Sequence, residues 1–203
     1  FKMEEGNLKL SIKKEKEVRL FNTNLECRNI DDRMIIEGYA VVFESPATHG
    51  YTEIIDKNAF NGADMKDVIL RYNHDDSHLL LARTRNNSLQ LTIDDKGLFI
   101  HAELIDTTSN RDIYKSIQAK LLDKMSFAFT VEAEENDYET NTRRILQFDK
   151  IFDVSIVDVP FYDTTEVFAR TLEKSESRFL EGKKKYDELK LEKEKLSTIL
   201  KCT

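Results

Sequence analysis

Apolar residues alternate with their neighbours in many short runs of this chain. In one such run Ile36, Gly38, Ala40 and Val42 are separated by single residues. A period of two is the pattern of a strand with one face toward a core. The runs that predict strands are Val18–Phe21, Met34–Phe43, Val68–His74, Leu79–Ala82, Ser88–Ile93, Leu98–Leu104, Met125–Val131, Arg144–Phe148 and Phe152–Val159.

Few segments have helical spacing. Ile113, Ile117 and Leu121 recur at helical intervals and predict a helix over residues 108–123. The run Ala59–Met65 predicts a second, short helix. Many short strands with few helices predict an α+β domain built on an antiparallel sheet or barrel.

The composition changes near both ends of the chain. Residues 1–17 are polar and predict an N-terminal arm, and residues 18–170 form the expected globular domain. Residues 171–203 are rich in Lys, Glu and Leu and predict a charged C-terminal helix that needs a partner, so we expect self-association. The residues near heptad a and d positions are Leu172, Phe179, Tyr186, Leu189, Leu196 and Leu200.

Charge and composition disfavour several classes of protein. The formal net charge of −7 argues against nucleic acid as the main partner, because phosphate binding draws on clustered Lys and Arg. No apolar run approaches the roughly 20 residues that cross a bilayer, so we expect a soluble, intracellular protein without membrane contact. Cys27 and Cys202 match no metal or redox spacing. No cofactor is expected.

Three residues fit nucleophilic catalysis by a serine. Such chemistry needs a neutral imidazole to take the hydroxyl proton and a third group to orient the ring. Of the four histidines, His74 is placed best, at the end of a predicted strand. Ser126 lies at a helix-to-strand junction, on a strand face of small residues, and Asp153 lies on the apolar face of another strand, where a carboxylate needs a partner.

Spacing alone leaves other interpretations open. It favours a hydrogen-bonded structural role for His74 over a catalytic one. His74 and His78 have the spacing of a helical metal pair, but no third zinc ligand is apparent. Paired-carboxylate glycosidase chemistry is compatible with the composition, although no spacing singles out a pair. The chain has no Gly-x-Ser-x-Gly motif, which disfavours an α/β-hydrolase.

Four segments in order carry a resemblance to a known family: Glu37–Phe43, Asn73–Asp75, Met125–Phe129 and Asp153–Pro160. They resemble the prohead proteases of tailed phages, relatives of the herpesvirus capsid maturation proteases, over about residues 18–170. The resemblance implies a mainly antiparallel β-barrel flanked by helices. It also implies that Ser126 is the nucleophile, His74 its base and Asp153 the residue that orients His74.

The resemblance further implies a serine endopeptidase that cleaves phage coat and scaffold proteins and itself. Such an enzyme would act inside the immature phage head in the bacterial cytoplasm, or be encoded by a prophage. The chain departs from the family at Asp153, where relatives commonly carry Glu or His. It also has Pro160, Phe161 and Tyr162 where herpesvirus members use arginines to support the oxyanion, so the oxyanion donors stay unassigned.

A second class of function fits the same sequence. A non-catalytic assembly protein of this fold would use the Lys/Glu-rich tail as a scaffolding helix to organise the coat. An inactive prophage remnant would have the same sequence features. The ordered His, Ser and Asp favour the enzyme, because a scaffold would need none of them.

Overall fold

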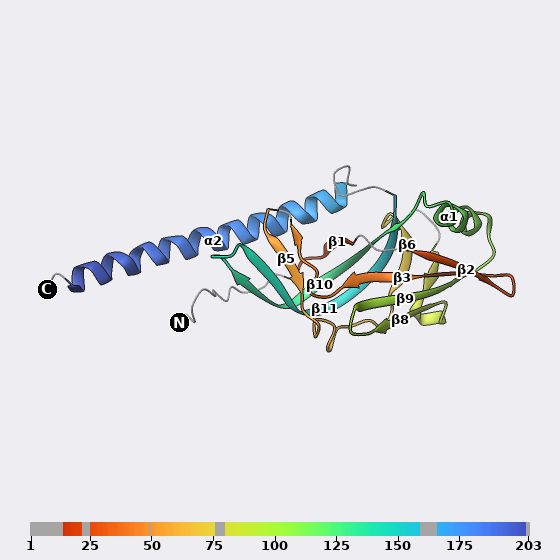
Figure 1. Ribbon diagram of the computed structural model, residues 1–203, viewed down its shortest axis with the longest axis horizontal. Helices are drawn as coiled ribbons and strands as arrows, with labels where there is room; N and C mark the ends of the chain where they lie inside the picture. The colour runs from red at the N-terminus through yellow and green to blue at the C-terminus, as the bar shows by residue number, and fades with distance from the viewer. Residues whose placement is uncertain (1–13, 22–24, 49, 76–79, 159–165, 202–203) are drawn as a thin grey trace.

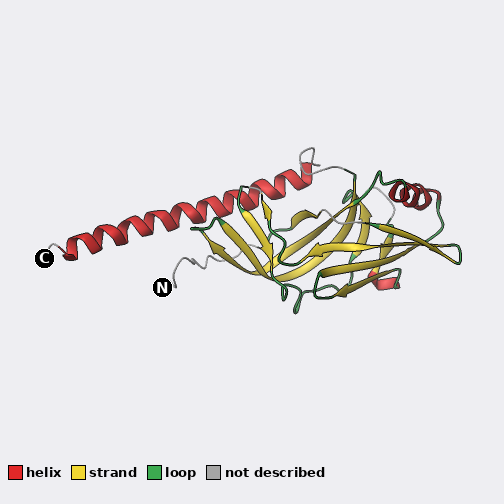
Figure 2. Cartoon of the chain, in the orientation of Figure 1, coloured by secondary structure: helices red, strands yellow, loops and turns green. Residues whose placement is uncertain are grey.

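The computed structural model describes residues 14–21, 25–48, 50–75, 80–158 and 166–201, which form two β-sheets and three helical segments (Figures 1 and 2). In chain order the elements are β1 (Glu17–Phe21), β2 (Glu26–Ile30), β3 (Arg33–Val42), β4 (Ala47–Thr48), β5 (Thr52–Ile55), β6 (Ile69–Tyr72), β7 (Ala82–Arg83), the 3-10 helix η1 (Thr84–Asn86), β8 (Leu89–Ile93), β9 (Gly97–Leu104), α1 (Thr108–Gln118), β10 (Lys124–Asp137), β11 (Thr142–Val157) and α2 (Glu166–Lys201).

The larger sheet is built around the long antiparallel pair β10 and β11. Among the described residues its order is β1-β10-β11-β5-β4, and β6 also pairs with β11 and carries β7 on its other side. β11 runs parallel to both β5 and β6. The smaller sheet is antiparallel, with the order β2-β3-β9-β8. The two strands that carry most of the predicted site, β10 and β11, therefore lie in the middle of the larger sheet.

The main core joins the two sheets. Phe127 and Phe129 of β10 stack with ring centroids 4.5 Å apart, and Phe148 of β11 meets Phe127 edge-on at 5.6 Å. The same cluster includes Ile36 of β3 and Ile100 of β9, both fully buried. Burying one such side chain contributes about 1.5–3 kcal/mol. Because these aromatic residues alternate with small ones on β10, the core fixes which way Ser126 points.

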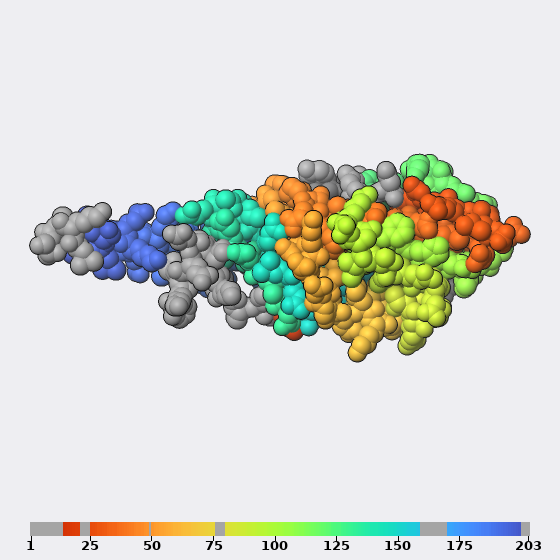
Figure 3. Space-filling view, turned by 60° about the horizontal axis from the view of Figure 1, so that its bottom comes forward, coloured from red at the N-terminus to blue at the C-terminus, as the bar shows by residue number. Residues whose placement is uncertain are grey.

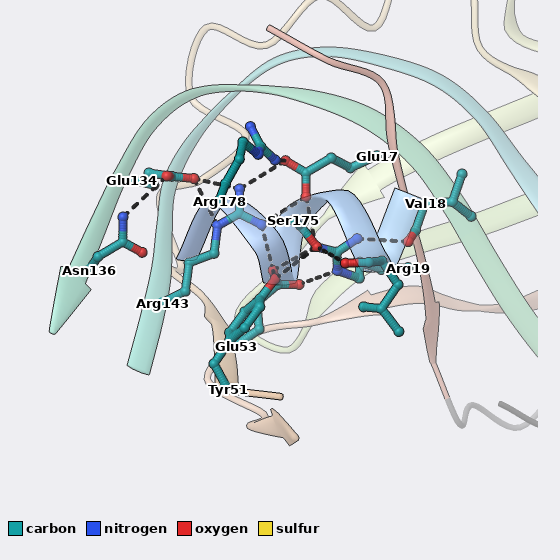
Figure 4. Close-up of polar contacts among 11 residues, drawn as sticks. Glu17, Val18, Arg19, Tyr51, Glu53, Glu134, Asn136, Arg143, Ser175 and Arg178 are labelled. Atoms are coloured by element: carbon teal, nitrogen blue, oxygen red, sulfur yellow. Dashed lines mark hydrogen bonds and ion pairs between the residues drawn. The ribbon is translucent and has the colours of Figure 1, made fainter. Parts of the chain in front are cut away.

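A buried ion network attaches β1 and α2 to the larger sheet (Figure 4). Arg19 of β1 donates to Glu53 of β5 at 2.7 Å, and Arg143 of β11 donates to Glu17 of β1 at 2.8 Å. Arg178 of α2 also binds Glu17, at 2.7 Å. Burial alone would raise the pKa of Glu17, but the charges of Arg143 and Arg19 outweigh it and lower that pKa well below its usual range. The ion pairs therefore join β1 to β5, β11 and α2.

The first half of α2 packs on the larger sheet, and its second half does not. Phe179 stacks on Tyr51 with centroids 4.7 Å apart, and Tyr138 packs against both Phe179 and Tyr186. Beyond Tyr186 the described apolar side chains of the helix are exposed, namely Leu189, Leu191, Leu196 and Ile199. This part of the helix extends past the β10–β11 hairpin (Figures 1 and 3). Within the described residues, no helix is both long enough and apolar enough to span a membrane.

Most predicted strands are confirmed, with shifted ends. Val18–Phe21, Met34–Phe43, Ser88–Ile93 and Leu98–Leu104 correspond to β1, β3, β8 and β9. Val68–His74 becomes the shorter β6, and Met125–Val131 becomes the longer β10. The two runs Arg144–Phe148 and Phe152–Val159 are parts of one strand, β11, and Leu79–Ala82 is reduced to Ala82–Arg83 in β7. Val159 and Leu79 lie outside the described residues.

Three expectations about the architecture need correction. The α+β class is confirmed, but the described strands form two open sheets and not a barrel. The edge of β11 that faces away from β10 pairs with β5 near one end and with β6 near the other. Ala59–Met65 is a series of turns and not a helix, because the Ala59 carbonyl accepts from the Phe148 N–H of β11 at 2.7 Å. The predicted helix at residues 108–123 ends at Gln118, before Lys120 with its left-handed φ of 58°.

Three described strands, β2, β4 and β5, had no prediction. β2 is largely exposed and lacks a clear alternation, while β4 and β5 are only two and four residues long. The division at residues 17 and 170 and the likeness to the herpesvirus protease fold stay predictions. Glu17, placed in the expected arm, is a buried member of β1, and α2 begins at Glu166.

The ion network predicts a large cost for removing one of its arginines. We expect Arg143→Ala to lower the free energy of unfolding by about 3–5 kcal/mol, because it leaves Glu17 and Glu53 short of a buried partner. Urea denaturation measures this loss. Arg33→Ala, which removes a half-exposed pair with Glu103, is the control and should cost at most about 1 kcal/mol. Equal losses in the two variants would contradict the importance given to the network.

Candidate active site

Ser126 lies on β10, on the face opposite the aromatic core. Met125 and Phe127 point into the core, so the alternation along the strand turns Ser126 to the other side. Its partners in the sheet are Leu20 on β1 and Ser155 on β11. Ser126 is only 1% exposed. The hydroxyl is therefore held in a fixed place between two strands.

Asp153 lies on β11, next to the strand of Ser126. It pairs with Ala128, two residues along β10 from Ser126, and it is almost fully buried. Ser155, two residues further along β11, lies on the same face. A buried carboxylate at this position needs a partner from another element.

That partner, His74, comes from the turn after β6. β6 runs parallel to β11 and ends with Tyr72 beside Ile156. Asn73 and His74 then adopt left-handed backbone conformations, with φ of 52° and 55°. Non-glycine residues in this region are uncommon and cluster at functional sites. The turn brings the imidazole over β11, with its side chain only 9% exposed.

The imidazole of His74 contacts both other residues. Its Nε2 lies 2.7 Å from the Ser126 Oγ, and its Nδ1 lies against the Asp153 Oδ1. An ionised carboxylate only accepts hydrogen bonds, so the Nδ1 of the neutral ring carries the proton and donates it to Asp153. The Nε2 is then free to accept the hydroxyl proton of Ser126. This is the arrangement that makes a serine nucleophilic.

Asp153 is ionised at neutral pH. Burial alone would raise its pKa, but the hydrogen bond and charge of His74, followed by the charge of Lys16, outweigh burial and lower the pKa of Asp153 below its usual value. The Lys16 ammonium lies 3.2 Å from the Asp153 Oδ2, the oxygen that does not face the ring. Each carboxylate oxygen of Asp153 therefore has its own partner.

The Ser126 hydroxyl has a second acceptor within reach. The backbone carbonyl oxygen of Arg19 on β1 lies 2.8 Å from the Ser126 Oγ. A hydroxyl has one proton, so it donates either to Arg19 or to the His74 Nε2. When His74 is charged, its Nε2–H donates to the Ser126 oxygen and the hydroxyl proton turns to Arg19. When the ring is neutral, both acceptors compete for that proton.

The three residues singled out in the sequence thus meet in space, although up to 79 positions separate them along the chain. Sequence reasoning missed Lys16, Ser155 and the Arg19 carbonyl. Lys16 lies in a segment expected to be a polar arm, Ser155 is one small residue in an apolar run, and a backbone carbonyl has no sequence signal. His78 of the considered zinc pair and the Pro160–Tyr162 segment lie outside the described residues.

Other reactive groups fit less well. Among the residues that the structure describes, no three His, Cys, Asp or Glu side chains are grouped to hold a metal ion. Cys27 is half-buried on β2, and burial raises the pKa of its thiol to about 11. The reactive thiolate of Cys27 is therefore scarce at neutral pH. Ser126 is the nucleophile that the geometry supports.

Comparison with known families gives one match. The model of the family described as caudovirus prohead serine protease matches residues 23–178. This range contains His74, Ser126 and Asp153. Lys16 and β1, which includes Arg19, precede it. Comparison with curated proteins and with solved structures gave no match.

The geometry predicts that a fluorophosphonate reagent labels Ser126 and that the label depends on Asp153. Asp153→Asn should slow labelling by about 10⁴-fold, the loss known for this change in a Ser-His-Asp triad, because an amide facing Nδ1 favours the tautomer with the proton on Nε2. Mass spectrometry of the labelled peptide measures the rate. Asp149→Asn, which changes a carboxylate bound to Thr130 and Lys14, is the matched control. Labelling of Asp153→Asn at the wild-type rate would contradict the role given to Asp153.

Proposed function

Because the chain belongs to the caudovirus prohead serine protease family, we propose that it is a serine endopeptidase that cleaves phage coat and scaffold proteins during prohead maturation. One observation supports the catalytic part of this proposal above all others. A single imidazole, that of His74, joins a buried serine hydroxyl to a buried, ionised aspartate. The family itself supports a general role in capsid maturation.

The proposed reaction proceeds through an acyl-enzyme. The Ser126 oxygen attacks the carbonyl carbon of the peptide bond while the His74 Nε2 takes the hydroxyl proton. The tetrahedral intermediate then collapses, the C–N bond breaks, and the Nε2 gives that proton to the leaving amine. A water molecule, deprotonated by the same nitrogen, attacks the ester carbon. The bond to the Ser126 oxygen then breaks, Nε2 returns the proton to that oxygen, and the new carboxyl end is released. Asp153 stays ionised throughout and stabilises the charged ring.

Asp153 replaces the Glu or His that is common at this position, and its direct contact with the ring supports its proposed role. A shorter acid must lie closer to the imidazole to reach it. Here Asp153 is on β11 itself, and β6 places the His74 turn directly beside that strand. The backbone thus makes up for the length of one methylene group.

The specific substrates, self-cleavage and the location inside the immature head are proposed from the family and not from the described geometry. Capsid proteins are the substrates that a prohead protease implies. The other proposal, a non-catalytic assembly protein, draws on the exposed leucines of α2, among them Leu189 and Leu196. The contacts of His74 favour the enzyme, because assembly alone would not require a base in contact with a buried hydroxyl.

Coexpression with the coat and scaffold proteins of the same phage tests the proposal. We expect new protein termini in mass spectra with the wild-type chain and none with Ser126→Ala, which lacks the nucleophile but keeps the packing. Ser116→Ala, on α1 and away from His74, should cleave like the wild type. Cleavage by Ser126→Ala, or a wild type that leaves both proteins intact, would contradict the enzyme.

Self-association through α2 is a further part of the proposal. The exposed leucines Leu189 and Leu196 are seven residues apart, the spacing of one heptad position. We expect light scattering to show a mass that rises with concentration, and Leu189→Lys with Leu196→Lys to return the chain to a monomer. A wild-type monomer at every concentration would contradict self-association.

A further inference from the structure

We propose that Ser155 is a positioning residue for the reaction at Ser126. The inference rests on the proposed function, and it adds a fourth side chain to the three already described. Ser155 lies on β11 and is fully buried. In the sheet it is directly opposite Ser126 on β10, and on the other side it pairs with Arg71 of β6. It is therefore placed among the three strands that supply the site.

The hydroxyl of Ser155 contacts both residues that act on Ser126. Its oxygen accepts a hydrogen bond from the backbone N–H of His74 at 3.2 Å and lies 3.1 Å from the His74 Nδ1. It donates its own proton to the Asp153 Oδ1 at 3.2 Å. Within the described part of the chain, the hydroxyl of Ser155 makes its polar contacts with His74 and Asp153. It therefore bridges the proposed base and the carboxylate that faces it.

One of these bonds holds the backbone that carries the imidazole. His74 has a left-handed φ of 55°, directly after Asn73 with a φ of 52°. Such a conformation persists only where surrounding contacts impose it. The Asn73 N–H binds the Ile156 carbonyl at 2.9 Å, and the His74 N–H binds the Ser155 Oγ. Ser155 thus supplies the contact that fixes the catalytic residue itself to β11.

The other contacts define the direction of the ring. Because the single proton of Ser155 goes to Asp153, the lone pairs of its oxygen face the two N–H groups of His74. The Nδ1–H therefore meets two acceptors on one side, the Asp153 Oδ1 and the Ser155 Oγ. Both acceptors stay in place when the ring becomes charged. The Nε2 is thereby kept pointing at Ser126, so Ser155 acts through His74 and not on the substrate.

Removal of the hydroxyl tests this role. We expect Ser155→Ala to slow fluorophosphonate labelling of Ser126 by roughly 10- to 100-fold, because a small misplacement of a catalytic group costs about that much. Ser155→Thr, which restores a hydroxyl, should recover most of the rate. Ser175→Ala removes another buried serine hydroxyl, bound to Leu172 and Arg19, and should label like the wild type. It controls for a general loss of stability, which thermal melting measures in each variant.

A second comparison distinguishes an effect of Ser155 on the His74 ring from a general effect on the structure. In a His74→Ala background the ring is absent, so adding Ser155→Ala should not lower the residual labelling rate further. If Ser155→Ala does not fold, Ser155→Cys, with a weaker hydrogen-bonding group of similar size, should show the slowed labelling instead.

Three results would overturn the inference: wild-type labelling by Ser155→Ala, an equal loss in Ser175→Ala, or a further loss in the His74→Ala background. These differ from a failure of the proposed function. In that case the wild-type chain would not be labelled at Ser126 at all.

Discussion

The hydrogen bonds of the His74 ring are the interaction on which the proposed function of this fold depends. Ser126 and Asp153 lie on neighbouring strands, β10 and β11, and cannot activate each other without a base between them. The proposed base, His74, follows β6, which runs parallel to β11 and ends beside it. The site therefore exists only when three distant parts of the chain are in register, and the aromatic core between the two sheets maintains that register.

The buried ion network also helps to hold the strands in register, although burying its charges costs desolvation free energy. Arg19 and Arg143 are removed from water, and burial of their charges is offset only by close carboxylates such as Glu17 and Glu53. β1 lies against β10, with the Arg19 carbonyl on the Ser126 hydroxyl. α2 is attached to the same network through Ser175 and Arg178 (Figure 4). The backbone around Ser126 is thus linked both to β1 and to the first half of α2.

Much of the fold follows from alternation in the sequence. The predictions that were wrong concerned segments whose structure depends on tertiary contacts. Strands with a buried face, such as β3 and β9, could be predicted, whereas the exposed β2 could not. Ala59–Met65 has apolar spacing, but the backbone groups of Ala59 and Asp64 bind β11, which spacing cannot reveal. The meeting of His74, Ser126 and Asp153 was expected from ordered motifs. Ser155 and the Arg19 carbonyl were not, because they matter only through where the strands place them.

The most direct test of the central claim, that His74 activates Ser126, is a crystal structure of the chain after reaction with a peptidyl phosphonate. We expect a bond from phosphorus to the Ser126 Oγ, with the His74 Nε2 within hydrogen-bonding distance of the phosphonate and Nδ1 still on Asp153. Phosphorus bound to another residue, or a His74 ring turned away from Ser126, would contradict that claim.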